Sequence, residues 1–187
     1  YYRQRSLPVV IFRLFNTVGP RQVGHYGMVI PRFVERALRG EALKVYGDGQ
    51  QSRCFLHVED AVAGIVALAE TPDAVGQVFN IGSSEEITIL DLARQVLQQV
   101  DTWRTNGRAS EYGTAGEDRM RLLDDRIAFV PYQEAYADGF EDMRRRVPNT
   151  AKLAALTGWQ QHKSLQQTLD DVIEEFTARQ ALPAAAD

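Results

Sequence analysis

The side chains best suited to chemistry in this sequence are arginines that can bind an oxyanion. Residues 144–146 are three consecutive arginines in a chain of 187 residues with a formal net charge of −4, so they form a basic cluster in an acidic background. A guanidinium group presents a planar fork of N–H donors that matches two phosphate oxygens, which a lysine ammonium does not. The cluster therefore indicates a local anion site, although adjacent arginines are more often a solvated face.

Asn16 is a second candidate because of the element that precedes it. Residues 8–15 form a nearly continuous apolar run rich in β-branched and aromatic side chains, which predicts a strand covered on both faces of a parallel sheet. Residues 17–27 contain three glycines and a proline and predict a loop on the carboxyl side of that strand, where ligands of open α/β sheets bind. The Asn16 amide can there donate to a diphosphate or fix the loop by a turn.

Short helices and strands alternate along the rest of the chain. Apolar spacing and turn signals predict helices over 28–39, 60–70, 88–100, 148–156 and 164–180, and strands over 43–46, 53–58, 77–81 and 127–130. The helix over 60–70 is expected to turn inward Ala61, Val62, Ile65, Val66 and Leu68. Capping-box patterns open two helices, at Thr88 and at Ser164. Residues 101–126 are polar, charged and dotted with glycine, which predicts an exposed insertion in a mixed α/β domain.

Composition excludes several classes of function. With 21 basic and 25 acidic residues, the chain lacks the basic surface that nucleic-acid binding requires. Cys54 is the only cysteine, so a reducing compartment is the simpler interpretation. No apolar run is long enough to span a membrane and no signal peptide is visible, so we expect a cytoplasmic protein without a membrane partner. The histidines are scattered, which predicts no metal site.

Four segments together resemble the extended short-chain dehydrogenase/reductase (SDR) family, in its nucleotide-sugar epimerase, dehydratase and decarboxylase branch. The segments are 13–21 (RLFNTVGPR), 43–55 (LKVYGDGQQSRCF) followed by 57–60 (HVED), 78–82 (VFNIG), and 145–149 (RRVPN) with Lys152 and 158–159 (GW). They cover nearly the whole chain outside 101–126. The resemblance implies an α/β fold: the C-terminal part of a Rossmann-like, extended SDR fold, in which mixed short strands and helices form the substrate-binding lobe.

The resemblance also implies roles for residues that would hold a nucleoside-diphosphate sugar. Arg53 looks like the arginine that clamps the diphosphate, and Arg145 and Arg146 resemble the second clamp, with Arg145 favoured as the ligand. Arg21 looks like the arginine that faces the reacting sugar in the decarboxylase branch, so it is the one candidate for a catalytic contact. The other implied substrate-binding residues are Asn16, Val29, Phe33, Lys44, Tyr46 and Asn80.

Several of these residues have an equally ordinary structural interpretation. Val29 and Phe33 lie one turn apart on a helix, as core residues do, although the start of this helix is implied to line the nucleotide. The strand of Lys44 and Tyr46 is implied to lie along the base, but Tyr46 would also suit a half-buried strand. Asn80 is placed where an asparagine commonly ends a strand.

The residues that carry out the reaction in the resembled family are missing from this chain. Family members have a glycine-rich loop whose amides cradle the cofactor pyrophosphate. They also have a Tyr-x-x-x-Lys pair, in which the tyrosine exchanges a proton with the sugar. No such loop is present, and no tyrosine here has a lysine four residues on. We therefore expect the pair upstream of Tyr1, NAD bound mainly by that N-terminal half, and no cofactor-binding residue within this chain.

These expectations assign residues 1–27 to the end of the dinucleotide-binding sheet and its loop, 28–180 to the nucleotide-sugar-binding lobe, and 181–187 to a frayed tail. The predicted function is the substrate-binding portion of an NAD-dependent nucleoside-diphosphate-sugar epimerase similar to UDP-glucose 4-epimerase. An enzyme like UDP-glucuronate decarboxylase or dTDP-glucose 4,6-dehydratase is the alternative on the same scaffold. A non-catalytic nucleotide-sugar binding module and a purely structural domain are alternatives of another class. The family resemblance also implies a homodimer of the intact protein.

Overall fold

The computed structural model describes residues 2–22, 28–105, 117–135 and 143–181. Its contacts divide the chain into two compact units, the first with residues 1–19, 53–86 and 146–168 and the second with residues 20–52, 87–145 and 169–187. Elements that contribute residues to both units are β4 (Ser52–Cys54), β7 (Glu86–Thr88), β9 (Arg145–Arg146) and α8 (Leu165–Ala181). The predicted division after residue 27 stays a prediction. The predicted loop 17–27, insertion 101–126 and tail 181–187 lie partly outside the described residues.

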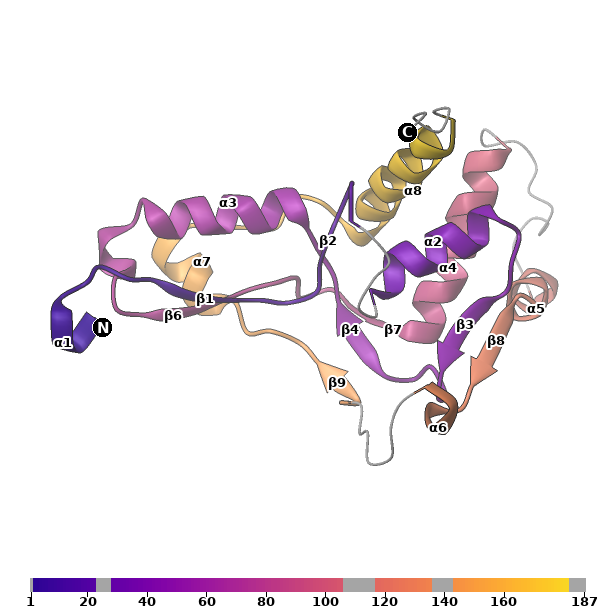
Figure 1. Cartoon of the computed structure of the whole chain (residues 1–187), viewed down its shortest axis with the longest axis horizontal. Coiled ribbons are helices and arrows are strands. Elements are labelled where there is room, and N and C mark those ends of the chain that lie inside the picture. The colour runs from indigo at the N-terminus through magenta and orange to yellow at the C-terminus, as the bar shows by residue number, and fades with distance from the viewer. Residues whose placement is uncertain (1, 23–27, 106–116, 136–142, 182–187) are drawn as a thin grey trace, which may run out of the picture. The chain divides into compact units, whose positions relative to one another are not determined.

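The first unit is built on two pairs of parallel strands. β1 (Ile11–Leu14) pairs with β6 (Val78–Ile81), in a register that places Leu14 beside Ile81. β2 (Thr17–Val18) pairs with β5 (Leu56–His57). Figure 1 shows helix α3 running alongside β1 and β6. The unit's helical elements are α1 (Tyr2–Arg5), α3 (Val58–Ala69), the single 3₁₀ turn Pro72–Ala74 and α7 (Ala151–Thr157).

The core of the first unit lies where α3 and α7 meet β6. Its buried members are Leu56, Ala61, Leu68, Ala74, Phe79, Ile81 and Leu153, with Val10, Ile65, Leu156 and Trp159 packed around them. This arrangement corrects part of the predicted inner face of α3, because Val62 and Val66 are 51% and 47% exposed. It also corrects the prediction of a strand covered on both faces. The apolar side chains of β1 are exposed, since the described helices bury their apolar residues against β6.

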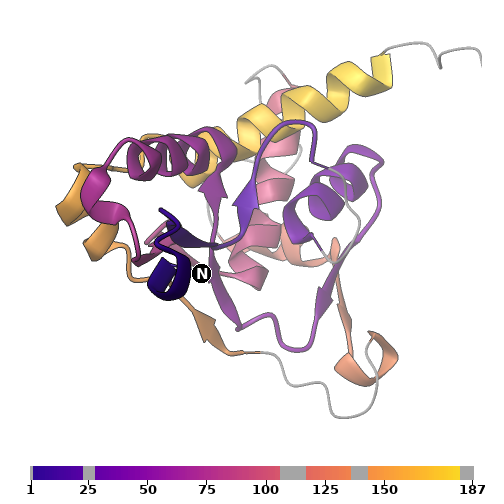
Figure 2. The same cartoon turned by 60° about the vertical axis from the view of Figure 1, so that its left-hand side comes forward.

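The second unit combines one parallel strand pair with packed helices. β3 (Leu43–Tyr46) pairs with β8 (Ile127–Val130), and both strands have the predicted bounds. Figure 2 shows α2 (Val29–Leu38) and α4 (Ile89–Arg104) beside this pair, and both helices contact β3. The remaining helices of this unit are α5 (Glu117–Asp124) and α6 (Tyr132–Ala135). Fully or nearly buried apolar side chains include Ile30, Phe33, Val34, Leu43, Val45, Leu92, Val96, Leu97, Leu123, Leu169 and Ile173.

Several predicted helix ends are confirmed by side-chain hydrogen bonds. At α4 the Thr88 hydroxyl accepts from Asp91 N at 3.0 Å. At α8 the capping box is reciprocal, since Gln167 N donates to Ser164 Oγ at 3.2 Å and Ser164 N donates to Gln167 Oε1 at 2.9 Å. Gly158 ends α7 with a left-handed φ of 71°.

Two predictions of local structure are wrong at their edges. The predicted insertion 101–126 was too wide, because α4 continues to Arg104 and the described residues 117–124 form α5. Helix α5 packs against the rest of the second unit through two contacts that its polar sequence did not predict. Leu123 is buried, and Arg94 Nε donates to Asp124 Oδ1 at 2.8 Å. The helix predicted from Pro148 begins at Ala151, because Asn149 Oδ1 accepts from Ala151 N in a local turn.

Candidate functional site

The candidate site of the first unit lies at the carboxyl ends of β1 and β6. Phe15 N donates to Ile81 O at 3.0 Å and so extends the strand pair by one step. The next residue, Asn16, has a φ of 40°, a left-handed conformation that asparagine tolerates better than most residues. The chain therefore turns sharply at Asn16, at the sheet edge where the sequence predicted a ligand.

Asn16 holds the segment that carries Arg53. Its side-chain Nδ2 donates to Cys54 O at 2.8 Å, and its backbone oxygen accepts from Leu56 N at 3.3 Å. Arg53 is half-buried in β4, between the buried residues Ser52 and Cys54. The predicted contact of Asn16 with a ligand stays a prediction, and the structure adds a hydrogen bond within the protein.

The three consecutive arginines have three different environments. Within the second unit, exposed Arg144 donates to Asp48 Oδ2 at 3.1 Å and its carbonyl accepts from Ser52 N at 2.8 Å. Arg145 is exposed. Arg146, in the first unit, is half-buried, and its guanidinium carbon lies 5.6 Å from the centre of the Phe15 ring, within cation–π range. Arg53 and Arg145 belong to different units, so their convergence on one pyrophosphate stays a prediction.

Gly82 allows the segment after Arg146 to approach the end of β1. A Cβ atom at Gly82 would lie 2.6 Å from Pro148 Cγ and 2.9 Å from Phe15 Cβ, closer than real Cβ contacts. Glycine is therefore required here for close packing rather than for a special backbone angle. These distances place Pro148 close to Phe15, and Arg146 lies two residues before Pro148.

Asn80 joins β6 to the same returning segment. Its Nδ2 donates to Asn149 O at 3.1 Å. Nearby, Lys152 Nζ donates to Val78 O at 3.0 Å and lies 4.5 Å from the centre of the Phe79 ring. These contacts give Asn80 and Lys152 a structural role in docking α7 on β6, next to the role that the sequence predicted for Asn80 in ligand binding.

The other predicted contacts belong to the second unit. Lys44 is exposed and Tyr46 half-buried on β3, and Tyr46 O accepts from Gln51 Nε2 at 3.0 Å. Val29 is half-buried at the first position of α2. Phe33 is 3% exposed, as its core interpretation requires.

Arg21 of the second unit adopts a strained backbone. It is exposed and has a φ of 67°, in the left-handed region that costs a side-chain-bearing residue about 1–2 kcal/mol. Such strain concentrates at ligand sites, which favours the predicted contact of Arg21 with a ligand.

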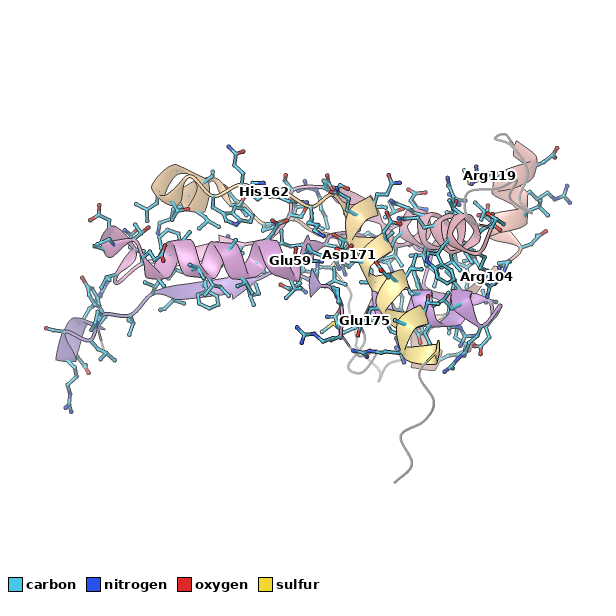
Figure 3. The ribbon with its side chains drawn as sticks, turned by 90° about the horizontal axis from the view of Figure 1, so that it is seen from above. Glu59, Arg104, Arg119, His162, Asp171 and Glu175 are labelled. Carbon is cyan, nitrogen blue, oxygen red and sulfur yellow. The ribbon has the colours of Figure 1, made fainter. Side chains whose placement is uncertain are left out.

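Sequence reasoning missed a buried polar network at the start of α3. Asp60 is 3% exposed, and its carboxylate accepts from His162 N at 3.2 Å and from Lys163 N at 2.9 Å. Buried His57 accepts from Glu59 N at 3.1 Å through Nδ1. Figure 3 labels Glu59 on the first turn of α3 and His162 in the segment that follows α7. The available signal was an acidic residue in the first turn of a helix, which usually favours the helix alone.

Two charged groups in the second unit have pKa values displaced by their neighbours. The backbone N–H of Gln50 and the guanidinium of Arg144 lower the pKa of Asp48. The Asp124 carboxylate, and to a lesser degree Asp91, raises the pKa of Arg94. Both displacements stabilise the charged forms, as expected for structural ion pairs.

Two further features, a group of metal ligands and a membrane-spanning helix, are absent from the described residues. Residues 2–22, 28–105, 117–135 and 143–181 contain no cluster of metal-ligating side chains. No helix in those same ranges combines the length and apolar character needed to cross a bilayer.

Residues 1–82 match the model of the NAD dependent epimerase/dehydratase family. Over 176 residues the chain is 35% identical to UDP-N-acetyl-alpha-D-glucosaminuronate decarboxylase of Bacillus cytotoxicus. The aligned region covers 94% of this chain and 48% of that protein. Residues 1–82 of this chain resemble the NAD-dependent epimerase/dehydratase family, and the similarity to the decarboxylase extends over 94% of the chain. The family resemblance predicted from the four sequence segments is therefore confirmed.

Solved structures of the epimerase/dehydratase family share the fold. UDP-glucose 4-epimerase from Thermotoga maritima, solved with UDP-glucose, has a TM-score of 0.74 at 25% identity, over 96% of this chain and 49% of that one. dTDP-glucose 4,6-dehydratase from Bacillus anthracis, solved in complex with NAD, has a TM-score of 0.73 at 27% identity, over 96% and 48%. The predicted Rossmann-like α/β fold is confirmed. The chain spans about half the length of these relatives, and its predicted place in their C-terminal part stays a prediction.

Proposed function

We propose that this chain binds the nucleoside diphosphate of a nucleotide sugar for an NAD-dependent enzyme of its family. The observation that carries the proposal is the environment of Arg146. Its guanidinium is held over the Phe15 ring, and among the described residues it has no hydrogen-bond or ion-pair partner. An arginine fixed by one face keeps its in-plane N–H donors for a bidentate contact with phosphate oxygens.

Arg53 supplies the second cation of the proposed site. It is half-buried in the same unit as Arg146, on the segment that Asn16 holds at the carboxyl end of β1. Two guanidinium groups match the two phosphates of a nucleoside diphosphate in charge. Binding energy from the diphosphate would then orient the sugar for reaction.

NAD would supply the hydride acceptor and donor for the sugar ring. The glycine-rich loop and the Tyr-x-x-x-Lys pair that such chemistry needs are missing from residues 1–187. The part of the reaction that we assign to this chain is therefore substrate binding and orientation.

Isothermal titration calorimetry with UDP, dTDP and GDP tests the proposal, with uridine as the ligand without phosphate. The diphosphates are expected to bind and uridine to bind far more weakly. Loss of a charge-assisted hydrogen bond is worth about 1.5–3 kcal/mol, so Arg53→Ala and Arg146→Ala should each weaken UDP binding about tenfold to a hundredfold. Arg3→Ala, which removes an exposed arginine of α1 in the same unit, is the matched control. Unchanged UDP affinity in both site variants refutes the proposal.

The reaction served by this site has two candidates. The sequence favours an epimerase similar to UDP-glucose 4-epimerase. A decarboxylase is the second candidate, because relatives that align with nearly the whole chain are named decarboxylases. Strained Arg21 would suit the negative charge of a uronic acid carboxylate.

Substrate conversion separates the two reactions. The assay uses this chain within the protein that also carries the tyrosine–lysine pair, supplied with NAD. Carbon dioxide released from UDP-glucuronate identifies a decarboxylase, whereas interconversion of UDP-glucose and UDP-galactose identifies an epimerase. Arg21→Gly, which accepts the same backbone angle, should abolish decarboxylation if Arg21 contacts the sugar carboxylate.

A further inference from the structure

Two adjacent residues at the end of β1, Phe15 and Asn16, contact the elements that carry both candidate phosphate ligands. The ring of Phe15 lies 5.6 Å from the Arg146 guanidinium carbon. The amide of Asn16 donates to the carbonyl of Cys54, the residue after Arg53. All of these residues belong to the first unit, so their arrangement is internal to one compact body.

Phe15 is held at its backbone and at its Cβ atom. Its backbone N–H is bonded to Ile81 O at 3.0 Å, which continues the β1–β6 register. Gly82 lies so close to Phe15 that a Cβ at Gly82 would be 2.9 Å from Phe15 Cβ and 2.6 Å from Pro148 Cγ. Because the backbone and Cβ of Phe15 are held, the point from which its ring extends toward the guanidinium of Arg146 is fixed. The N–H donors at the edge of the guanidinium stay available to an anion, because cation–π stacking uses its face.

Asn16 grips the chain on both sides of Phe55. Its side chain donates to Cys54 O and its backbone oxygen accepts from Leu56 N. The φ of 40° at Asn16 brings both contacts to one place. Since Arg53 directly precedes Cys54 in the chain, these two hydrogen bonds also set the direction in which the Arg53 side chain extends from β4.

We propose that Phe15 and Asn16 are positioning residues for phosphate binding, Phe15 acting through Arg146 and Asn16 acting through Arg53. This inference rests on the proposed function, because both arginines act there as ligands of the diphosphate. Neither positioning residue has to touch the ligand itself. Replacing Phe15 should therefore change nothing further once Arg146 is gone, and replacing Asn16 should change nothing further once Arg53 is gone.

Two double-mutant cycles, read by calorimetry with UDP, test the proposal. A cation–π contact of partial exposure is worth about 0.5–2 kcal/mol, so Phe15→Leu should weaken UDP binding about twofold to thirtyfold. Phe15→Tyr keeps the aromatic face and should bind UDP with the affinity of the unsubstituted chain. In the Arg146→Ala background, Phe15→Leu should leave the UDP affinity unchanged, and uridine binding should be insensitive to it throughout.

The Asn16 cycle uses two replacements that accept the left-handed backbone. Asn16→Gly removes the amide, and Asn16→Asp keeps the size but replaces the N–H donor with a carboxylate facing Cys54 O. Each should weaken UDP binding severalfold in the unsubstituted chain and leave it unchanged in the Arg53→Ala background. A direct contact between Asn16 and the ligand would instead make Asn16→Gly and Arg53→Ala additive, which overturns this half of the proposal.

A readout without ligand guards against loss of folding. The Arg146 side-chain Nε–H resonance should be shifted by the aromatic ring current in the unsubstituted chain and in Phe15→Tyr, and the shift should vanish in Phe15→Leu while the thermal transition is retained. Absence of that shift, or additivity in the Phe15 cycle, overturns the positioning role of Phe15 although the arginines still bind UDP. Failure of Arg53→Ala and Arg146→Ala to weaken UDP binding overturns the proposed function, and the positioning inference with it.

Discussion

The indole Nε1 of Trp159 donates a hydrogen bond of 3.0 Å to the backbone carbonyl of Asp60. It reinforces the two bonds that the Asp60 carboxylate accepts from the backbone of residues 162 and 163. Together they fasten the segment after α7 to the first turn of α3. Asp60 is almost completely buried, whereas His162 is exposed and Lys163 is half-buried, so water can replace part of what its removal takes away.

Replacing Asp60 should destabilise the protein. A backbone N–H that loses its partner away from water costs about 1–3 kcal/mol, and Lys163 is the more buried of the two donors, so Asp60→Ala should lower the free energy of unfolding by about 1–3 kcal/mol. Asp60→Asn keeps one acceptor oxygen and should lose less. Urea unfolding measures both variants, with Asp73→Ala at an exposed position of the same unit as the matched control. Equal stability of Asp60→Ala and Asp73→Ala would contradict the structural role.

A methyl group at Gly82 should disturb both stability and the site. The added Cβ meets Pro148 Cγ at 2.6 Å, and such overpacking costs about 1–3 kcal/mol. Because the same atom also meets Phe15, Gly82→Ala should weaken UDP binding as well. Thermal unfolding and calorimetry measure the two effects.

Gly64 provides the comparison for Gly82. Its added Cβ would lie 3.2 Å from Ile81 Cγ2 and from Trp159 Nε1, a milder approach, and alanine gains about 1 kcal/mol of helix propensity within α3. Gly64→Ala should therefore be close to neutral and should leave UDP binding unchanged. A larger loss of stability in Gly64→Ala than in Gly82→Ala would contradict the packing described here.

The cap of α4 should contribute measurably to the second unit. Thr88 accepts from Asp91 N at 3.0 Å, and loss of such a cap costs about 0.5–2 kcal/mol. Thr88→Ala should lower the denaturation midpoint, whereas Thr88→Ser should retain it. Thr102→Ala, on the exposed side of the same helix, controls for the loss of a hydroxyl. An equal effect of Thr88→Ala and Thr102→Ala would show that the cap does not contribute.

The ion pair of Asp48 should make stability depend on pH in the acid range. The hydrogen bond from Gln50 N and the charge of Arg144 lower the pKa of Asp48 below its ordinary value of 3.8. A group whose pKa is lower in the folded state contributes stability above its unfolded pKa, and that contribution is lost as pH falls through the folded pKa. The stability difference between the unsubstituted chain and Asp48→Asn should therefore shrink as the solution becomes more acidic.

Titration of the Asp48 carboxyl by NMR checks the assignment directly. Its midpoint should lie below the ordinary value and should rise only in part in Arg144→Ala, because the Gln50 hydrogen bond is the larger cause. Added salt should screen the contribution of Arg144 and leave that of Gln50. A midpoint at or above 3.8 would contradict the structure.

Local sequence patterns predicted the elements that depend only on residues close together in the sequence. The alternation in 43–46 predicted β3 with its observed bounds, because alternate side chains of a strand face opposite sides. The strand predicted over 127–130 also has the observed bounds of β8. The cap at Thr88 and the capping box at Ser164 were predictable because all their atoms lie within four residues. At Thr88 the returning half of the predicted box is wrong, because Asp91 accepts from the Thr88 hydroxyl. The faces of α3 were not predictable, because Val62 and Ala61 are equally apolar in sequence and only the position of β6 decides which is buried.

The candidate site was predictable to the extent that its residues lie in recognisable motifs. The resemblance selected Arg53, Arg146 and Asn16 from segments that are distant in sequence. It favoured Arg145 over Arg146 as the phosphate ligand. The two arginines differ in that Arg146 lies over the ring of Phe15, a residue distant in sequence. Phe15 could not be chosen as a partner, since an aromatic residue ending an apolar strand is expected to be core.

The division of each unit among three segments constrains how the protein is made. The first unit uses residues 1–19, 53–86 and 146–168, so a ribosome must synthesise residue 168 before that unit has all its parts. Until then β1 can find β6, but the segment that carries Arg146 and Leu153 has not emerged. We therefore expect the first unit to complete its folding only after residue 168 has been synthesised, with the packing of α7 on β6 among the last contacts to form.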